Sequence, residues 1–426
     1  MTSKKNSHDA PGRSPRGSVP QGDLYNPLDP RFVTDPHPFL HRLRREDPVH
    51  WNPVLNVWVL TAYAEVFKAL HDDRLSSDMR HWDHYKQFFF RGGDPSGPVT
   101  QTFSKWMLQV DPPEHTRLRA LATKTFTPRA VGRMRLYIDE MTHRLLDKVA
   151  GAGEMDLVNE LAYPLPIAVV ASMLGVPEED HEKMKAWTEG MLPSFAPSMS
   201  AEALDNSNEA VTAFRDYFCN LVKNRSQEPR DDLLSALIAV YEAGDRLSED
   251  ELLSTCILLM FAGHISTTQL ISDTILWLAN NPEQLEMLKL DPGLIEGAIE
   301  ESLRYTSPTQ MVYRVALEDM EIGGKSVKKN QLVILSLAAA NRDPAQFPDP
   351  DRFDIIRENN RHIALGHGTH YCMGAALGRL EGEVAVGVIV NRLPNIRVDH
   401  DSITREPNII FRSLKSMRIT FDAHRR

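Results

Sequence analysis

The chain has little cysteine. It contains three, Cys219, Cys256 and Cys372, in 426 residues. Their wide spacing does not form the disulfide framework of a small secreted domain, so we expect a reducing compartment, the cytoplasm.

Basic charge and long apolar runs are also scarce. Lys and Arg number 48 against 58 Asp and Glu, which gives a formal net charge of -10. A nucleic-acid-binding protein carries a basic face or stripe, so we expect no nucleic-acid partner. No apolar run approaches the roughly 18 residues that a membrane span needs, so we expect no contact with a membrane.

The first 23 residues lack a hydrophobic stretch and are rich in Ser, Pro, Gly, Lys and Arg. This composition is not that of a secretory signal and is typical of a disordered tail. An organelle transit peptide is the alternative. We predict that residues 24–426 form a single domain without internal repeats.

Helical patterns dominate the rest of the chain. The longest covers residues 246–282, where Ser248 and Glu251 form a capping box and the middle is apolar on nearly all faces. Such a helix should run through the interior. Short strands are expected on both sides of Asn52-Pro53 and within residues 320–337. The sequence therefore predicts a mainly α fold with small β-sheets.

Two further local predictions concern the segment before the first long helices. Residues 77–105 are aromatic and then rich in Gly and Pro, which indicates a long loop of functional importance. In VDPPEHTRLR, Asp111 is the expected N-cap of a helix and Pro112 its first residue.

Residues 363–374, IALGHGTHYCMG, are too rich in glycine for a regular helix and precede a predicted helix. A cysteine at a helix start meets the positive end of the helix dipole and free N–H groups, which lower the thiol pKa. The thiolate of Cys372 would bind a soft metal or haem iron. Gly366, Gly368 and Gly374 would let the backbone pass close to a flat partner.

Taken alone, this segment is also compatible with three different roles for Cys372. It could be a small buried apolar residue, a hydrolase nucleophile, or a zinc ligand with His367 and His370. A structural zinc site needs four ligands, and no second pair stands at a suitable spacing. A hydrolase would need a base and an orienting group, which are not evident. Covalent c-type haem is excluded because C-x-x-C-H is missing.

Further motifs accompany this loop in a fixed order. They are AGHIST in the long helix, ESLR with Glu301 and Arg304, NRDP at 341–344, FPDPDRF with Arg352, and LGHGTHYCMG around Cys372. Each is weak alone. As an ordered set over about residues 24–423 they make the chain resemble a cytochrome P450 of the soluble bacterial type. The matching family patterns are A/G-G-x-D/E-T, E-x-x-R and F-G-x-G-x-H-x-C-x-G.

The resemblance implies the cytochrome P450 fold, with haem buried between the long central helix and the proximal cysteine-bearing helix. It implies a non-covalent haem b whose iron is bound by the Cys372 thiolate, a ligand that favours O–O cleavage. It also implies a structural network of Glu301, Arg304 and Arg352 behind the cysteine loop. Further residues at haem-binding positions, several of them donors suited to the two propionates, are His115, Arg119, Arg314, His370, Ala262 and Gly366.

The sequence departs from the family pattern in two places. Leu365 replaces the usual Phe beside the sulfur, which should alter packing and the redox potential. In the central helix, Ile265 replaces the usual acid and Ser266 the usual Thr, followed by Thr267. Isoleucine cannot carry a proton, so Ser266 and Thr267 are the catalytic candidates.

Two kinds of chemistry follow from these departures. In the first, Ser266, water or a polar group of the substrate completes the proton relay, and ordinary hydroxylation or epoxidation results. The alternative is atypical oxidation, such as C–C or C–O coupling, ring formation or desaturation, or peroxide-driven turnover. A non-catalytic haem binder or gas sensor is a third class, against which the lack of a signalling domain counts.

The substrate implied by the resemblance is a small organic molecule, such as a secondary metabolite. The aromatic candidates in the 77–105 loop have core packing as their alternative role. The candidate contacts are Trp82, His84, Tyr85, Phe88 and Phe89 in that loop, Leu259 and Gly263 in the central helix, and Gln310, Met311, Val312, Ile410 and Phe411 in later segments.

The resemblance further implies a cytoplasmic monomer that receives electrons from a ferredoxin and an NAD(P)H-dependent ferredoxin reductase. Such partners dock through small electrostatic surfaces. Arg117, Lys124 and Arg379 are candidates for positive charge on the proximal face. The alternative is that they are ordinary surface charges.

Overall fold

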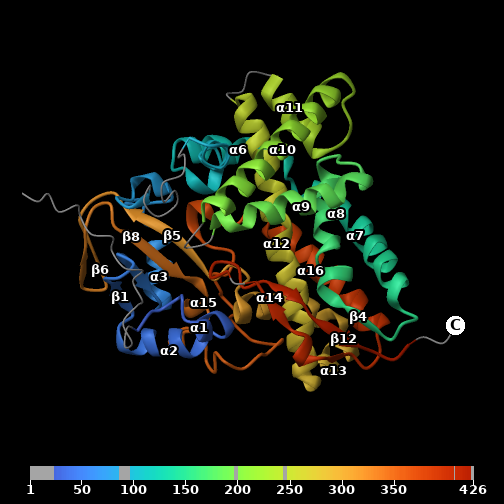
Figure 1. Ribbon diagram of the computed structural model, residues 1–426. Helices are drawn as coiled ribbons and strands as arrows, with labels where there is room; N and C mark the ends of the chain where they lie inside the picture. The colour runs from blue at the N-terminus through green and yellow to red at the C-terminus, as the bar shows by residue number, and fades with distance from the viewer. Residues whose placement is uncertain (1–23, 86–95, 196–199, 243–246, 407, 424–426) are drawn as a thin grey trace, which may run out of the picture.

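The computed structural model describes residues 24–85, 96–195, 200–242, 247–406 and 408–423. The predicted tail, residues 1–23, lies outside this range. Figure 1 shows a small sheet with short helices on one side and a larger assembly of long helices on the other.

Helices make up most of the described chain. They are α1 Pro30–Thr34, α2 His37–Glu46, α3 Tyr63–Ala69, α5 Pro98–Phe103, α6 Glu114–Thr125, α7 Pro128–Val149, α8 Pro164–Met173, α9 His181–Met191, α10 Ala201–Gln227, α11 Leu233–Glu242, α12 Glu249–Asn280, α13 Pro282–Leu290, α14 Ile295–Thr306, α15 Leu337–Ala340 and α16 Ala375–Arg392.

The strands are short. They are β1 Val49–Asn52, β2 Val57–Leu60, β3 Leu75–Ser76, β4 Glu154–Asp156, β5 Met311–Ala316, β6 Met320–Ile322, β7 Lys325–Val327, β8 Leu332–Ser336, β9 Arg397–Val398, β10 Thr404–Arg405, β11 Leu414–Ser416 and β12 Arg418–Thr420.

The largest sheet has the strand order β1-β2-β8-β5-β3, with β2 and β8 parallel and the other neighbours antiparallel. Its first hairpin is the one predicted around Asn52-Pro53. The Asn52 side chain accepts hydrogen bonds from the backbone N–H groups of Val54 and Leu55 at 3.0 and 2.8 Å, which shapes the turn. β5 contains Met311 and Arg314, both of which are buried.

α12 is the predicted central helix. The Ser248 hydroxyl accepts from the Glu251 N–H, and the Glu251 carboxylate accepts from the Ser248 N–H, so the expected capping box is confirmed. The helices α8, α10, α14 and α16 pack around it (Figure 1). By length and composition α12 could cross a membrane, but 78% of its apolar window is buried within the protein. It is thus placed as a core helix.

Two local predictions are wrong. The stretch 77–105 contains a helix, α5, whose first residue is Pro98. Asp111 does not cap the following helix, because α6 begins at Glu114 with Pro113 as its N-cap. The Asp111 carboxylate instead accepts from the Ser77 N–H at 2.8 Å and pairs with the Ser76 hydroxyl. It therefore ties α6 to the end of β3.

The buried network behind the cysteine loop has a different third member from the one expected. Arg304 and Glu301 are fully buried and form an ion pair at 2.7 Å. Arg357, not Arg352, completes it, with Nε 3.1 Å from a Glu301 oxygen. The Arg352 side chain is 63% exposed and its nearest carboxylate, Asp354, is 3.8 Å away. Arg352 takes part only through its main chain: its carbonyl accepts hydrogen bonds from the side chains of Arg304 and Arg357.

This arrangement predicts unequal effects of removing the two arginines. Arg357→Ala leaves a buried carboxylate without one of its partners and should lower the free energy of unfolding by about 3 kcal/mol. Arg352→Ala removes an exposed side chain and should change it by less than about 0.5 kcal/mol. Urea unfolding followed by circular dichroism measures both. Equal losses in the two variants would contradict the assignment.

Candidate active site

The cysteine loop is shaped by backbone contacts. The Cys372 N–H donates to the Leu365 carbonyl at 2.9 Å, which closes the loop just before α16. Gly366 and Gly368 both have positive φ, 70° and 68°. A Cβ on Gly368 would lie 2.8 Å from the Leu70 carbonyl oxygen, so glycine is required there by the chain next to α3. The sequence instead predicted that Gly368 would let the backbone pass close to a flat bound molecule.

The thiol itself is not activated as the sequence suggested. Burial raises the pKa of Cys372, against the lowering effects of the Gly374 N–H and of the Arg119 and Arg379 charges. The helix start therefore does not by itself produce a thiolate. A metal cation would, because coordination displaces the thiol proton.

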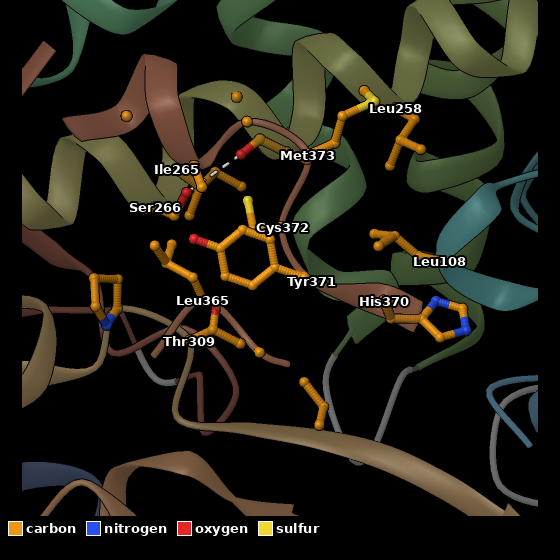
Figure 2. Close-up of a pocket in the computed structure, with 18 of the residues that line it drawn as sticks. Leu108, Leu258, Ile265, Ser266, Thr309, Leu365, His370, Tyr371, Cys372 and Met373 are labelled. Carbon is orange, nitrogen blue, oxygen red and sulfur yellow. Dashed lines mark hydrogen bonds between the residues drawn. The ribbon is translucent and has the colours of Figure 1, made fainter. Parts of the chain in front are cut away.

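Cys372 lines a cavity of about 380 Å³ between α12 and the loop. Figure 2 shows Cys372 with Ile265 and Ser266 of α12 around the same space. Leu365, the replacement for the usual Phe, also lines it. The cavity is large, and most of the side chains around it are apolar.

One end of the cavity is lined by basic groups. His115, Arg119, Arg314 and His370 all border it, and the His115 and His370 rings are 4.2 Å apart. Both ring nitrogens of His115 are buried and lack a hydrogen-bond partner among the described residues. Asp111 is the acid whose charge acts on His115 and Arg314.

The pKa values of these groups are lowered mainly by burial, and those of the two histidines also by neighbouring arginines. Burial and then Arg314 lower the pKa of His370 to about 3, and burial and Arg119 lower that of His115. Burial lowers the pKa of Arg314 to about 10. A ligand with carboxylates would pair with the arginine charges and satisfy the His115 nitrogens. The donor set thus fits the propionates of haem b, with Cys372 available to the iron.

The α12 motif borders the same cavity. Ala262, Gly263, Ser266 and Thr267 line it together with Ile265. The Ser266 hydroxyl donates to the Ala262 carbonyl at 3.3 Å, and the Thr267 hydroxyl to the Gly263 carbonyl at 3.1 Å. A Cβ on Gly263 would lie 2.6 Å from a methyl group of Val170, so close packing on α8 requires glycine here.

The expected substrate contacts divide into two groups. The first lines the cavity and consists of Leu259, Gly263, Met311, Val312, Ile410 and Phe411. Gln310 does not line it, because its amide nitrogen donates to the Thr306 and Ser307 carbonyls at 2.8 and 2.5 Å and so turns back toward α14.

The aromatic loop does not supply the expected lid. Trp82 is buried in one hydrophobic cluster with Met79 and Met311, and neither Trp82 nor His84 borders the cavity. Tyr85 packs against the same core cluster. The alternative of core packing is therefore correct for Trp82 and Tyr85. Phe88 and Phe89 lie outside the described residues.

Several cavity residues were missed. Apart from Phe261 on α12, they lie in short turns or single helical turns, where hydrophobic periodicity gives no signal. Phe195 stacks on Phe261 at 4.7 Å, and Trp106 on Phe103 at 4.0 Å, which makes one wall aromatic. Trp106, Met107, Leu108, Gln109, Phe195, Phe261 and Thr309 are among the missed cavity residues.

The candidate docking cations are paired. Arg117 bonds Glu251, and Arg379 bonds Glu300 at 2.6 Å. Burial opposes ionisation of Glu300, but hydrogen bonds from His362 and Arg379 lower its pKa to about 2. Arg117 and Arg379 therefore carry compensated charge, as ordinary surface ion pairs do. The Lys124 side chain is outside the described part of the structure.

Comparison with known proteins gives consistent matches along nearly the whole chain. The model of the family Cytochrome P450 matches residues 63–291 and 293–413. The 6-deoxyerythronolide B hydroxylase of Saccharopolyspora erythraea is 37% identical over 372 residues, 86% of this chain and 91% of that protein. The polyketide biosynthesis cytochrome P450 PksS of Bacillus subtilis is 34% identical over 406 residues, 93% and 98% of the two chains.

A solved structure agrees in fold. P450BioI in complex with hexadec-9Z-enoic acid ligated acyl carrier protein superimposes with a TM-score of 0.85 at 37% identity. The match covers 92% of this chain and 99% of that one.

The basic end of the cavity predicts a pH dependence. His115 and His370 have pKa values below the ordinary 6.5, so below that pH the unfolded chain binds more protons than the fold. The haem-free protein should lose stability as the pH falls from 6.5 toward 3, and haem should weaken this dependence.

Thermal unfolding across that pH range measures the effect. His115→Asn should flatten the curve of the haem-free protein, whereas the same change at the exposed His400 should leave it unchanged. An equally steep curve in His115→Asn would contradict the charge argument.

Proposed function

The chain belongs to the cytochrome P450 family and is a haem-dependent monooxygenase, and we propose that it hydroxylates or epoxidises a small organic substrate of secondary metabolism. The observation that carries the proposal is the cavity in which Cys372 faces the α12 hydroxyls across mainly apolar walls. When bound, haem b supplies the iron at which O2 is reduced. Cys372 would hold the iron, and His115, Arg119, Arg314 and His370 the propionates.

The lining supports an apolar, sizeable substrate. Phe195, Phe261 and Phe411 form an aromatic wall, and Met311 and Ile410 close the β-sheet side. Apolar walls exclude water and bind a substrate mainly by its shape, while few polar groups fix its orientation. The names of relatives in polyketide biosynthesis agree with such a substrate.

We assign the proton-handling roles to Ser266 and Thr267. Their hydroxyls are the polar side-chain groups that α12 presents at the cavity beside Ile265. Ile265 favours a second candidate function, atypical oxidation such as C–C or C–O coupling, ring formation or desaturation, or peroxide-driven oxidation. These reactions depend less on an acid at that position.

Electrons are proposed to come from a ferredoxin and its NAD(P)H-dependent reductase in the cytoplasm, and the enzyme is proposed to act as a monomer. The cations Arg117 and Arg379 are committed to Glu251 and Glu300. The docking surface would therefore carry ion pairs with little net charge. The resulting weak electrostatic attraction suits a short-lived electron-transfer complex.

The first test is the spectrum of the reduced protein with carbon monoxide. The wild-type protein should show the long-wavelength Soret band of thiolate-ligated haem. Cys372→Ser should lose that band because a hydroxyl replaces the sulfur ligand. Cys219→Ser, which changes a half-buried cysteine on α10, is the control and should keep it. A normal band in Cys372→Ser would refute the ligand assignment.

The second test concerns α12. Ser266→Ala should lower the product formed per NADH about tenfold, less than the roughly 10²–10⁴-fold effect of a complete general acid, because water partly substitutes. Ile265→Asp should raise it by restoring an acid. A substrate found by its spectral shift on binding is used for both. Unchanged coupling in Ser266→Ala would exclude its role in the relay.

A further inference from the structure

Trp106 carries a buried hydrogen-bond donor that has no acceptor in the described part of the chain. The residue directly precedes the single turn Met107–Gln109, borders the cavity and is only 1% exposed. Its indole Nε1–H lacks a hydrogen-bond partner among the described residues. A buried N–H group without a partner is unfavourable, and a buried tryptophan nitrogen usually has one. A molecule bound in the cavity would supply the missing acceptor.

Ring packing places Trp106 on the α12 side of the cavity. Its ring centre lies 5.7 Å from that of Phe261 on α12 and 6.2 Å from that of Phe195. The Phe103 ring stacks on it at 4.0 Å, so three neighbouring rings hold the indole in place. Cys372 reaches the same cavity from the loop before α16. The donor is therefore on the side where the substrate, rather than the cysteine ligand, is expected.

The aromatic wall of Phe195, Phe261 and Phe411 continues the surface to which Trp106 belongs. Phe195 and Phe261 are stacked, with their ring centres 4.7 Å and their planes 16° apart. The Phe411 ring makes angles of 72° and 73° with these two rings. Phe195 and Phe411 are only half-buried. Aromatic rings attract one another beyond the effect of burial, so the wall favours an aromatic substrate over a saturated one of the same shape.

Other unpaired polar groups of the cavity have different surroundings. The Ser77 hydroxyl also lacks a partner among the described residues, but the Ser77 N–H donates to Asp111, whose charge acts on Arg314. Ser77 thus lies with the basic groups assigned to the propionates. Glu381, whose carboxyl is likewise unpaired there, belongs to α16, the helix that follows the cysteine loop. Of these groups, Trp106 is the one that adjoins the aromatic wall.

We propose that the substrate is an aromatic molecule with a hydrogen-bond acceptor, such as an aryl carbonyl group, and that the Trp106 Nε1–H selects and orients it. This rests on the proposed function, because it names the substrate class of the same cavity. The ring system packs on the aromatic wall, and the carbonyl oxygen accepts from Trp106. These two contacts together determine which part of the molecule is turned toward Ser266. Trp106 is a specificity-determining residue and takes no part in the oxygen chemistry.

Three probes of similar shape separate the two features of this substrate class. Benzophenone has aromatic rings and a carbonyl, diphenylmethane lacks the carbonyl, and dicyclohexyl ketone lacks the aromatic rings. Equilibrium dialysis with the haem-loaded protein measures the Kd of each. Benzophenone should bind several times more tightly than either of the others, since it alone uses both the donor and the wall. No preference for benzophenone, or no binding of any probe, contradicts the proposal.

Removal of the indole N–H tests the role of Trp106. Trp106→Phe keeps an aromatic ring, so it should weaken benzophenone binding roughly tenfold and leave diphenylmethane binding nearly unchanged. Trp82→Phe is the matched control, because it makes the same change at a tryptophan that is 3% exposed and does not border the cavity. It should alter neither Kd. An equal loss for both probes in Trp106→Phe would indicate a packing effect and overturn the role of the N–H.

The carbonyl stretch of bound benzophenone reports the hydrogen bond directly. With a 13C-labelled carbonyl, the infrared band should lie at lower frequency in the wild-type complex than in an apolar solvent, and Trp106→Phe should abolish this shift. A shift that persists in Trp106→Phe identifies water as the donor and refutes the assignment. If Trp106→Phe does not fold, the wild-type complex decides: a lowered frequency with preferred binding of benzophenone supports the proposal, and the frequency of apolar solvent contradicts it.

The outcomes distinguish this proposal from the proposed function. A normal carbon monoxide spectrum together with equal binding of the three probes overturns the substrate class and leaves the monooxygenase intact. A wild-type protein without the thiolate band overturns the proposed function, whatever the probes show.

Discussion

The ion-pair network of Glu301, Arg304 and Arg357 is the constraint on which the site depends. Buried charges are tolerated when every donor is used, and here the spare guanidinium N–H groups bind main-chain carbonyls of residues 341 and 348–352. Asn341 continues the connection, since its side-chain oxygen accepts from the Ile363 N–H at 2.8 Å. The irregular segment is thereby fixed, and with it the start of the loop that presents Cys372.

The cavity that this loop closes is lined by polar groups of opposite character. Arg119 and Arg314 place positive charge beside His115, whose ring nitrogens lack a hydrogen-bond partner among the described residues, and the Glu381 carboxyl lacks one there as well. The protein does not neutralise these groups with each other. Such uncompensated burial is unfavourable in the protein alone and indicates that bound molecules complete the hydrogen bonds. Haem propionates suit the basic groups, and water suits the Glu381 carboxyl.

The sequence predicted what local signals encode. The capping box at Ser248 and Glu251 marked the start of α12, and the glycines around Cys372 marked the loop. It did not distinguish Arg352 from Arg357, because both lie in an irregular segment whose turns decide which side chain points inward. It likewise missed Glu381, since a glutamate within an apolar helix shows its isolation only once its neighbours are placed.

The hydrogen-bond directions on α12 explain why a donor outside that helix is needed. The single hydroxyl hydrogens of Ser266 and Thr267 are directed to the carbonyls of Ala262 and Gly263. Each hydroxyl can then only accept from its other neighbours, and it can release its proton only if another arrives. Ile265 offers none. Water or a polar group of the substrate in the cavity would have to supply that proton.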